Sequence, residues 1–353
     1  MSNNEQRDKL TPKFGEFSSS KLLLHPTQFK GAMDRDLSTP PISVEISLTS
    51  LCNVSCVWCI DRHWCESYPG ILEKDAILRA LEGYKELGVQ GVVLEGGGEP
   101  TIYPHFGEVV QKIKDLGMSI GLITNGVAFP DFELVKYFDW IRVSLDAGTK
   151  EVYKEVKKAD KFDDVMSNLK SFVEHKGENT IIGVGYLISQ LTRENLGGVV
   201  QDIKDIGVDY VQIRQLTECG DWELPPSYYL GDIEAMQSDT FSVYAQQMEE
   251  YEDHNLGLPC SCHALSSVLC HDGKVFFCCR LHSIRLPDST TLGYIGNIYD
   301  NTIKEIWDGD LRKKYAENML KVENCENWCP SCRMTKYNVL VEEIKNKGKT
   351  SFI

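Results

Sequence analysis

The segment SVEISLTSLCNVSCVWC, residues 43–59, joins a short alternating run of residues to three closely spaced cysteines. Alternation of polar and apolar residues over SVEIS (43–47) predicts a half-buried β-strand. Cys52, Cys56 and Cys59 follow this strand with the spacing C-x3-C-x2-C. In α/β folds, loops at the carboxyl ends of parallel strands carry the chemistry. The segment therefore predicts a thiol or metal site after the first strand of such a fold.

The residues that follow repeat the strand pattern, with helices in between. Helices are predicted over 73–88, 106–117 and 193–206, and strands over 91–95, 119–124, 140–146, 181–188 and 210–216. The strands at 119–124 and 140–146 are each followed by helical periodicity. Alternation at about thirty-residue intervals predicts an α/β fold with parallel strands and right-handed crossovers. An open doubly wound sheet and a partial barrel both fit this pattern.

The pattern also suggests how the chain divides. Residues 1–42 are expected to form an N-terminal lead-in, closed by the extended stretch STPP (38–41). Residues 43–234 contain the alternating strands and helices. From residue 235 onward short strands, turns and cysteines replace them, so residues 235–353 are expected to form a small C-terminal α+β domain.

Composition narrows the possible partners and the compartment. The chain has 353 residues, and 37 Lys and Arg against 52 Asp and Glu give a formal net charge of −15. This charge disfavours nucleic acid or an anionic membrane as the main partner. The N-terminus lacks the layout of a signal peptide, and no apolar run reaches the length of about eighteen residues that spans a bilayer. A cytoplasmic location is expected, where the 13 cysteines act as metal ligands or reactive thiols.

Two kinds of metal site fit the first three cysteines. A structural zinc site needs a fourth ligand, which Cys65 or His63 can supply. A 4Fe–4S cluster held by three thiolates keeps one iron open for a further ligand. The spacing favours the cluster.

A glycine-rich loop follows the second predicted strand, in the sequence EGGGEPTIYP (95–104). Consecutive glycines let the backbone approach a ligand closely and expose unpaired amide and carbonyl groups. An ordinary loop would explain this segment if it stood alone.

Together the cysteine and glycine motifs resemble the radical S-adenosylmethionine (SAM) superfamily, over about residues 43–216. In that family C-x3-C-x2-C follows the first strand, an aromatic residue such as Trp58 precedes the third cysteine, and a GGEP motif follows the second strand. The resemblance favours a partial (β/α)6 TIM-like barrel. It implies that Cys52, Cys56 and Cys59 hold a 4Fe–4S cluster whose open iron is chelated by SAM.

The resemblance also implies the reaction. One-electron reduction by a donor such as flavodoxin or ferredoxin cleaves SAM, and the 5′-deoxyadenosyl radical abstracts a hydrogen atom from a substrate. The loop implied to bind the SAM amino group consists of Gly96, Gly97, Gly98, Glu99 and Pro100. Asn125, Ser144 and Arg214, which lie towards the ends of the third, fourth and sixth strands, correspond to positions that contact SAM in the family. Local hydrogen bonding at strand ends is the alternative for these three residues.

A second cysteine group lies in the predicted C-terminal domain. Cys262, Gly273 and Cys278 have the spacing C-x10-G-x4-C around a predicted hairpin with an Asp-Gly turn. This pattern resembles the SPASM and twitch extensions of radical SAM enzymes. It implies one auxiliary 4Fe–4S cluster, with structural zinc on the same thiols as the alternative. The implied ligands are Cys262, Cys278, Cys329 and Cys332, while Cys260, Cys270, Cys279 and Cys325 remain as spare cysteines that can exchange into the site.

The substrate is the least defined part of the sequence analysis. The segment KLLLHPTQFKGAMDRDLSTPPISVEISLTSLCN (21–53) resembles radical SAM proteins of sugar and aminoglycoside-type pathways, which implies a carbohydrate-like small molecule. Cys219, just after the sixth strand, is a candidate hydrogen donor for an epimerase, whereas an electron-accepting auxiliary cluster implies a dehydrogenase. A small packed residue is the alternative role for Cys219. The alternative functions are modification of a peptide or protein, as in ribosomal peptide or sulfatase maturation, and a non-enzymatic zinc-binding interaction module.

Overall fold

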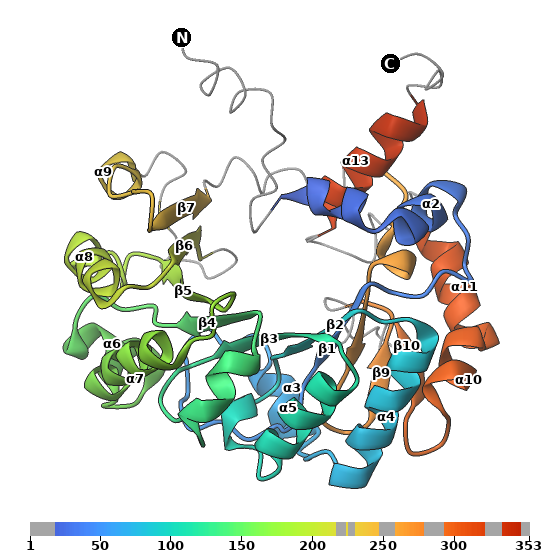
Figure 1. Cartoon of the computed structure of the whole chain (residues 1–353), viewed down its shortest axis with the longest axis horizontal. Helices are drawn as coiled ribbons and strands as arrows, with labels where there is room; N and C mark the ends of the chain where they lie inside the picture. Colours follow the sequence, from blue (N-terminus) through green and yellow to red (C-terminus); the bar gives the residue numbers. More distant parts are fainter. Residues whose placement is uncertain are drawn as a thin grey trace.

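The structure, a computed structural model, describes residues 18–216, 224, 230–246, 258–278, 293–321 and 334–346. Its strands form one curved sheet with the order β10-β9-β8-β1-β2-β3-β4-β5-β6-β7 (Figure 1). The sheet is open, since its two edge strands, β10 and β7, do not pair with each other. None of the helices within these ranges has the length and apolar character needed to cross a membrane.

The centre of the sheet consists of parallel strands. These strands are β1 (Ser43–Ile46), β2 (Gly91–Leu94), β3 (Ser119–Thr124), β4 (Trp140–Ser144), β5 (Ile181–Ile188) and β6 (Tyr210–Gln215). The connecting helices lie on the convex side of the sheet (Figure 1). They are α4 (Lys74–Leu87), α5 (Phe106–Asp115), α6 (Lys150–Lys157), α7 (Phe162–His175) and α8 (Leu196–Ile206). The partial TIM-like barrel is confirmed.

One crossover differs from the predicted pattern. Between β3 and β4 the structure contains only the short 3-10 helix η3 (Phe132–Tyr137). Asp131 caps it by accepting a hydrogen bond from the Glu133 amide at 2.9 Å. The connection is short and its first part is a loop, so no α-helix of several turns fits before β4 begins.

The sheet continues at both edges into the C-terminal part of the chain. β7 (Ser242–Gln246) pairs in parallel with β6, and β8 (Ser266–Leu269) pairs in parallel with β1. β9 (Lys274–Phe276) and β10 (Tyr294–Asn297) then continue the sheet as antiparallel strands. Gly273, at φ +81°, forms the turn of the β8–β9 hairpin that the Asp-Gly pair predicts.

Short elements complete the described parts. The first cysteine loop runs into α3 (Arg62–Ser67), and the remaining elements are η2 (Pro100–Ile102), α9 (Gly231–Glu234), η6 (Cys262–Ala264), α10 (Ile303–Asp308) and α11 (Asp310–Met319). Near the N-terminus η1 (Ser19–Leu24) and α2 (Pro26–Asp34) pack against α13 (Thr335–Asn346). Leu22, Leu265 and Val341 belong to the small hydrophobic cluster that joins them.

The main core lies between the sheet and the helices. Along β1 and β4 fully buried residues, such as Val44 and Val143, alternate with half-buried ones, such as Glu45 and Arg142. The buried set packs in one cluster with the apolar residues of the covering helices, including Ile77 of α4. The alternate residues therefore face the concave inner side of the sheet, and this is the side available for a ligand.

Candidate active site

The first cysteine loop lies between β1 and α3, and the end of α6 holds it in place. The Ser55 amide donates to the Lys157 carbonyl at 2.9 Å, and the Val57 amide donates to the Val156 carbonyl at 2.9 Å. Arg62 Nη2 donates to the Cys56 carbonyl at 2.6 Å. These contacts fix the backbone of the loop and do not involve its thiols.

The three predicted ligands fit a three-thiolate cluster. Cys52 and Cys59 are exposed, Cys56 is half-buried, and none of the three is in a disulfide. Partial desolvation by the surrounding protein raises the pKa of Cys52 to about 11 and also raises the pKa of Cys59. The Cys52 and Cys59 thiols are therefore protonated in the absence of metal, and binding of iron displaces these protons.

No three His, Cys, Asp or Glu side chains within the described ranges are already arranged around a single metal ion. An iron–sulfur cluster is larger than one ion, so its ligands need not converge on one point. Cys65, the alternative fourth ligand for zinc, lies in α3, and desolvation raises its pKa to about 12. His63, in the same helix, is exposed.

The glycine loop packs directly against the cysteine loop. The Gly98 amide donates to the Thr49 carbonyl at 2.8 Å, and the Glu99 amide donates to the Leu51 carbonyl at 2.8 Å. A Cβ on Gly98 would lie 1.9 Å from the Leu51 carbonyl oxygen, so only glycine allows this approach. Gly96, at φ +75°, has no atom within 4 Å of an added Cβ, which leaves open space for a ligand beside its backbone.

The Glu99 side chain is buried, and its carboxylate is hydrogen-bonded to other groups of the protein. Its carboxylate accepts hydrogen bonds from the Thr101 amide at 3.2 Å, Thr101 Oγ1 at 2.7 Å, Thr124 Oγ1 at 2.6 Å and the Asn125 amide at 2.8 Å. Burial raises the pKa of Glu99, and these hydrogen bonds oppose the rise. The carboxylate therefore fixes the loop, and backbone groups of the glycines are what the motif offers to a ligand. Pro100 begins η2 and is buried.

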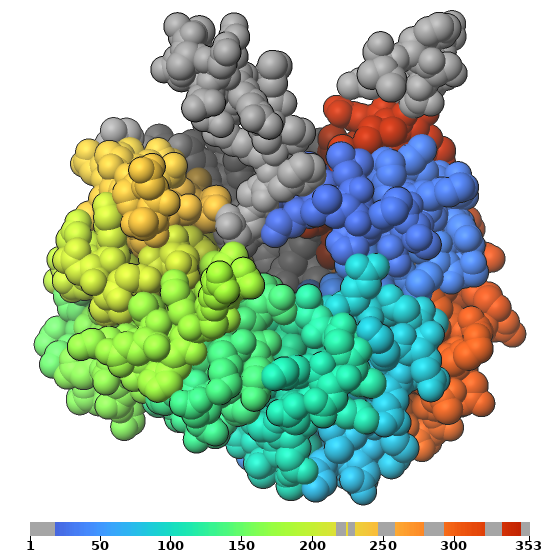
Figure 2. Space-filling view, in the orientation of Figure 1, coloured from blue at the N-terminus to red at the C-terminus, as the bar shows by residue number. Residues whose placement is uncertain are grey.

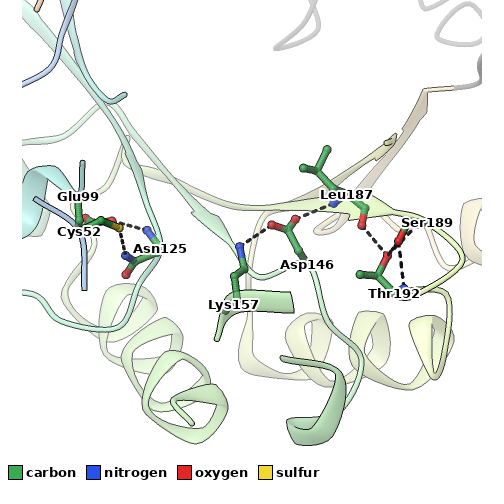
Figure 3. A network of polar contacts seen from close by, with 8 residues as sticks. All are labelled: Cys52, Glu99, Asn125, Asp146, Lys157, Leu187, Ser189 and Thr192. Carbon is green, nitrogen blue, oxygen red and sulfur yellow. Dashed lines mark hydrogen bonds and ion pairs between the residues drawn. The ribbon is translucent and has the colours of Figure 1, made fainter. Parts of the chain in front are cut away.

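Asn125 contacts the first cysteine. Its Nδ2 lies 3.8 Å from Cys52 Sγ (Figure 3). Nδ2 also donates to Asn53 Oδ1 at 2.6 Å, and Oδ1 accepts from the Val127 amide at 2.9 Å. The amide side chain is thus fully engaged next to the predicted cluster. Trp58, the aromatic residue before Cys59, is half-buried and packs on the main core.

Ser144 and Arg214 lie on the inner face of the sheet. The register aligns Ser144 with Gly185 and Gln212, and aligns Arg214 with Leu187. On the same face Arg142 crosses over β5, where Gly185 leaves room, and Nη1 donates to Gln212 Oε1 at 2.9 Å. In the space-filling view α8 lies on one side of the molecule and α2 on the opposite side (Figure 2). Cys219 lies outside the described residues.

A buried ion pair beside the cysteine loop was missed by the sequence analysis. Lys157 Nζ donates to Asp146 Oδ2 at 2.5 Å, and their side chains are only 2% and 4% exposed. Asp146 Oδ1 accepts from the Leu187 amide at 2.7 Å (Figure 3). Asp146 follows β4 in the left-handed region at φ +53°. An acidic residue just after a strand, and a lysine at the end of the next helix, are the signals available in the sequence.

A short network at the end of β5 extends this polar layer. Ser189 and Thr192 bond to each other, and Thr192 Oγ1 donates to the Leu187 carbonyl at 2.7 Å (Figure 3). The Leu187 residue thus donates its amide to Asp146 and accepts at its carbonyl from Thr192. The network fixes the carboxyl end of β5 beside that of β4.

The β8–β9 hairpin reaches the same site, which the sequence did not suggest. His271 is 1% exposed, and its Nδ1 lies 3.3 Å from Ser47 Oγ while Nε2 donates to the Tyr68 carbonyl at 2.7 Å. A Cβ on Gly97 would lie 2.2 Å from Ser47 Oγ and 3.0 Å from His271 Nδ1. The hairpin of the second cysteine group therefore supports the glycine loop.

The second cysteine group is buried. Cys262 and Cys278 lie together, and Cys260 joins them as a third thiol that the sequence analysis had set aside as a spare. The Cys262 amide donates to Cys260 Sγ at 3.4 Å, and hydrogen bonds with Cys260 and Cys278 raise the pKa of Cys262. Cys270, at the far end of β8, is buried elsewhere, where desolvation raises its pKa. The remaining cysteines of this group lie outside the described residues: Cys279, Cys325, Cys329 and Cys332.

Comparison with known families agrees with both cysteine groups. Residues 46–213 match the model of the radical SAM superfamily, and residues 260–333 match that of an iron–sulfur cluster-binding domain, SPASM. The chain is 21% identical over 297 residues to a tungsten-containing aldehyde ferredoxin oxidoreductase cofactor-modifying protein of Pyrococcus furiosus, with 75% of this chain and 80% of that protein covered. It is 28% identical over 186 residues to a probable GTP 3′,8-cyclase of Saccharolobus islandicus, a match that covers 51% of this chain and 59% of the cyclase.

Solved structures share the fold. Streptococcus suis SuiB bound to S-adenosylmethionine superposes with a TM-score of 0.61 at 17% identity, covering 87% of this chain and 75% of SuiB. Native anSMEcpe with bound AdoMet and a peptide superposes with a TM-score of 0.58 at 18% identity, covering 85% of this chain and 88% of that chain. From its two family matches, the chain belongs to the radical SAM superfamily and carries a C-terminal iron–sulfur cluster-binding domain of the SPASM type.

Proposed function

We propose that this radical SAM enzyme abstracts a hydrogen atom from a carbohydrate-like small molecule bound at the inner face of the sheet. The observation that carries the proposal is the polar character of that face, where Glu45, Arg142, Gln212 and Arg214 replace the apolar residues of the helix-covered side. A substrate with many hydroxyl groups needs such partners, because each buried polar group must be hydrogen-bonded. The lead-in resemblance to sugar-pathway proteins supports the same substrate class.

The site residues have separate parts in the proposed reaction. When bound, the 4Fe–4S cluster and SAM supply the 5′-deoxyadenosyl radical. Cys52, Cys56 and Cys59 would hold the cluster, and the backbone of Gly96–Gly98 would receive the amino group of SAM. Ser144 and Arg214 lie on the inner face where they can contact the rest of SAM. Glu99 and Asn125 would keep the two loops in register through Leu51 and Asn53, and Trp58 would contribute its aromatic ring beside Cys59.

The C-terminal domain would hold one auxiliary 4Fe–4S cluster. Cys262 and Cys278 are the described members of the proposed ligand set, with Cys329 and Cys332 completing it and Cys260 adjacent. We place the functional units at residues 1–42, 43–234 and 235–353. We further propose a reducing, cytoplasmic setting, in which cysteines act as thiols or metal ligands, with flavodoxin or ferredoxin as the electron donor.

The outcome of the reaction depends on the fate of the substrate radical. Cys219 would return a hydrogen atom in an epimerase, and the auxiliary cluster would accept an electron in a dehydrogenase. Peptide modification is the second candidate, because the neighbours SuiB, in a structure bound to precursor peptide SuiA, and anSMEcpe with a bound peptide share the fold. A polar inner face can also bind a peptide backbone.

Formation of 5′-deoxyadenosine tests the proposed function directly. The anaerobically reconstituted protein should contain about eight irons, four per cluster, and should cleave SAM when a reductant and substrate are present. Sugars, aminoglycoside-type compounds and peptides are compared in parallel by mass spectrometry. Stimulation by peptides alone would replace the carbohydrate proposal with its alternative, and stoichiometric zinc with little iron would refute the redox function altogether.

A further inference from the structure

A fully buried cation lies next to the second cysteine group. The side chain of Arg312, in α11, is 0% exposed, and its guanidinium carbon lies 3.6 Å from the centre of the Trp307 ring. Its Nη2 donates to the His263 carbonyl at 3.0 Å. His263 directly follows Cys262, so the hydrogen bond joins the guanidinium to the segment that carries this buried thiol, and the two groups interact electrostatically.

The other contacts of Arg312 are also uncharged. Nη1 donates to the carbonyls of Leu37 and Trp307, and Nε has no hydrogen-bond partner within the described parts of the chain. No described carboxylate forms an ion pair with this guanidinium. Asp308 and Asp36 attract the guanidinium only from beyond ion-pair distance, because Asp308 pairs with Lys304 at 2.8 Å and is 54% exposed, and Asp36 bonds to Ser38.

Such an arrangement is costly unless an anion is present. A buried charge without a counter-charge loses several kcal/mol of solvation, and its carbonyl partners recover only part of that. Lys157 shows the contrast, because this equally buried cation has Asp146 as its partner. Desolvation lowers the pKa of Arg312 to about 10, which still leaves it charged at neutral pH.

We propose that Arg312 is the buried counter-charge of the auxiliary iron–sulfur cluster and raises its reduction potential. A cluster held by thiolates is anionic, and each electron that it accepts adds negative charge. A fixed cation in a low-dielectric environment stabilises the reduced form more than the oxidised form. Arg312 therefore makes the auxiliary cluster a better electron acceptor through its charge.

This inference rests on the proposed auxiliary cluster, and its consequence is specific to that cluster. Arg312 is on α11 and contacts the Cys262–His263 segment, whereas the first cysteine loop contacts Lys157. A change of charge at Arg312 should shift the potential of one cluster and leave the other unchanged. The first cluster therefore serves as an internal reference.

The test uses paired variants of the full chain. Arg312→Gln removes the charge and keeps a hydrogen-bond donor, while Arg312→Lys keeps the charge and loses the planar fork. Lys313→Gln, at an exposed neighbouring position of the same helix, controls for the loss of one positive charge. The potentials of both clusters are measured by redox titration monitored by electron paramagnetic resonance, together with the iron content.

Arg312→Gln should lower the midpoint potential of the auxiliary cluster by about 59 mV, for transfer of one electron. At the wild-type midpoint potential, the ratio of reduced to oxidised cluster should then be about tenfold lower in the variant. Arg312→Lys should restore most of this change, and Lys313→Gln should have no such effect. Equal potentials in wild type and Arg312→Gln would overturn the inference while leaving the proposed function intact. A wild-type protein with only about four irons would instead refute the auxiliary cluster itself.

Loading of the cluster provides a second readout if Arg312→Gln does not take up eight irons. The counter-charge role predicts that Arg312→Lys still loads both clusters. A purely structural role, in which Arg312 only joins the Leu37 and His263 carbonyls, predicts that both variants lose the auxiliary cluster alike. That second result would also overturn the inference.

Discussion

The buried ion pair between Asp146 and Lys157 gives the sharpest test of how the cysteine loop is supported. We consider Asp146→Asn, because asparagine keeps an Oδ1 acceptor for the Leu187 amide and tolerates the left-handed backbone at φ +53°. The variant therefore removes the negative charge and keeps the size of the side chain. Lys157 is then left buried without a counter-charge.

The size of the effect follows from the burial of both groups. With exposures of 2% and 4% and a separation of 2.5 Å, the pair is shielded from water. Removing one partner of a buried pair costs about 3–5 kcal/mol. At about 2 °C per kcal/mol, as expected for a large chain, Tm should fall by roughly 6–10 °C.

The assay is anaerobic unfolding of the cluster-free protein, with three variants that form a double-mutant cycle. Lys157→Met should also be strongly destabilising, and the double variant should lose less than the sum of the two single variants, with a coupling of about 2 kcal/mol. Asp163→Asn is the control, because it breaks an exposed pair in which Asp163 is 69% and Lys150 is 56% exposed. This variant should lower the free energy of unfolding by less than about 1 kcal/mol.

Two results would contradict this reasoning. A loss below about 1 kcal/mol in Asp146→Asn would mean that the pair behaves as a surface ion pair. Additive effects of the two single variants would mean that the charges do not stabilise each other. Because the Lys157 carbonyl also holds the Ser55 amide, we expect faster loss of iron from the first cluster in Asp146→Asn, measured by bleaching of its absorbance with a chelator.

Further predictions concern the glycine loop, the first cluster and the remaining thiols. Gly98→Ala should abolish SAM binding, measured by equilibrium dialysis, because the added Cβ would lie 1.9 Å from the Leu51 carbonyl oxygen. Gly96→Ala has open space for its Cβ but a strained φ, and it should lower the free energy of unfolding by only about 1–2 kcal/mol. Asn125→Asp places a carboxylate beside Cys52 Sγ and should lower the potential of the SAM-binding cluster in a redox titration; an unchanged potential would exclude an electrostatic role. Cys260→Ala should alter the spectrum of the auxiliary cluster while leaving SAM cleavage in place, and an unaltered spectrum would exclude Cys260 as a ligand. Cys219→Ala should still form 5′-deoxyadenosine but yield no epimerised product, and full activity with an oxidised product would exclude the donor role.

Local pattern accounts for the features that were predictable from the sequence. The alternating run before Cys52 predicts β1, and the Asp-Gly pair at 272–273 predicts the β8–β9 hairpin, because strand and turn preferences act over a few neighbouring residues. The cysteine spacing and the GGGEP loop are likewise short, contiguous motifs. Their placement after successive parallel strands brings them to one edge of the sheet, as the contact between Gly98 and Leu51 confirms.

Long-range contacts decided the rest, because sequence spacing does not specify which distant residues meet. Strand alternation gives no partner for β8, which joins β1 through the path of the whole chain. The sequence does not distinguish Cys260 from the other spare cysteines, and only the fold shows that it lies beside Cys262. Arg312 looks like an ordinary charged residue of an amphipathic helix, and only the packing of α11 against a segment 49 residues away buries it. Burial turns a solvated charge into one that needs a counter-charge, and burial is a property of the tertiary structure.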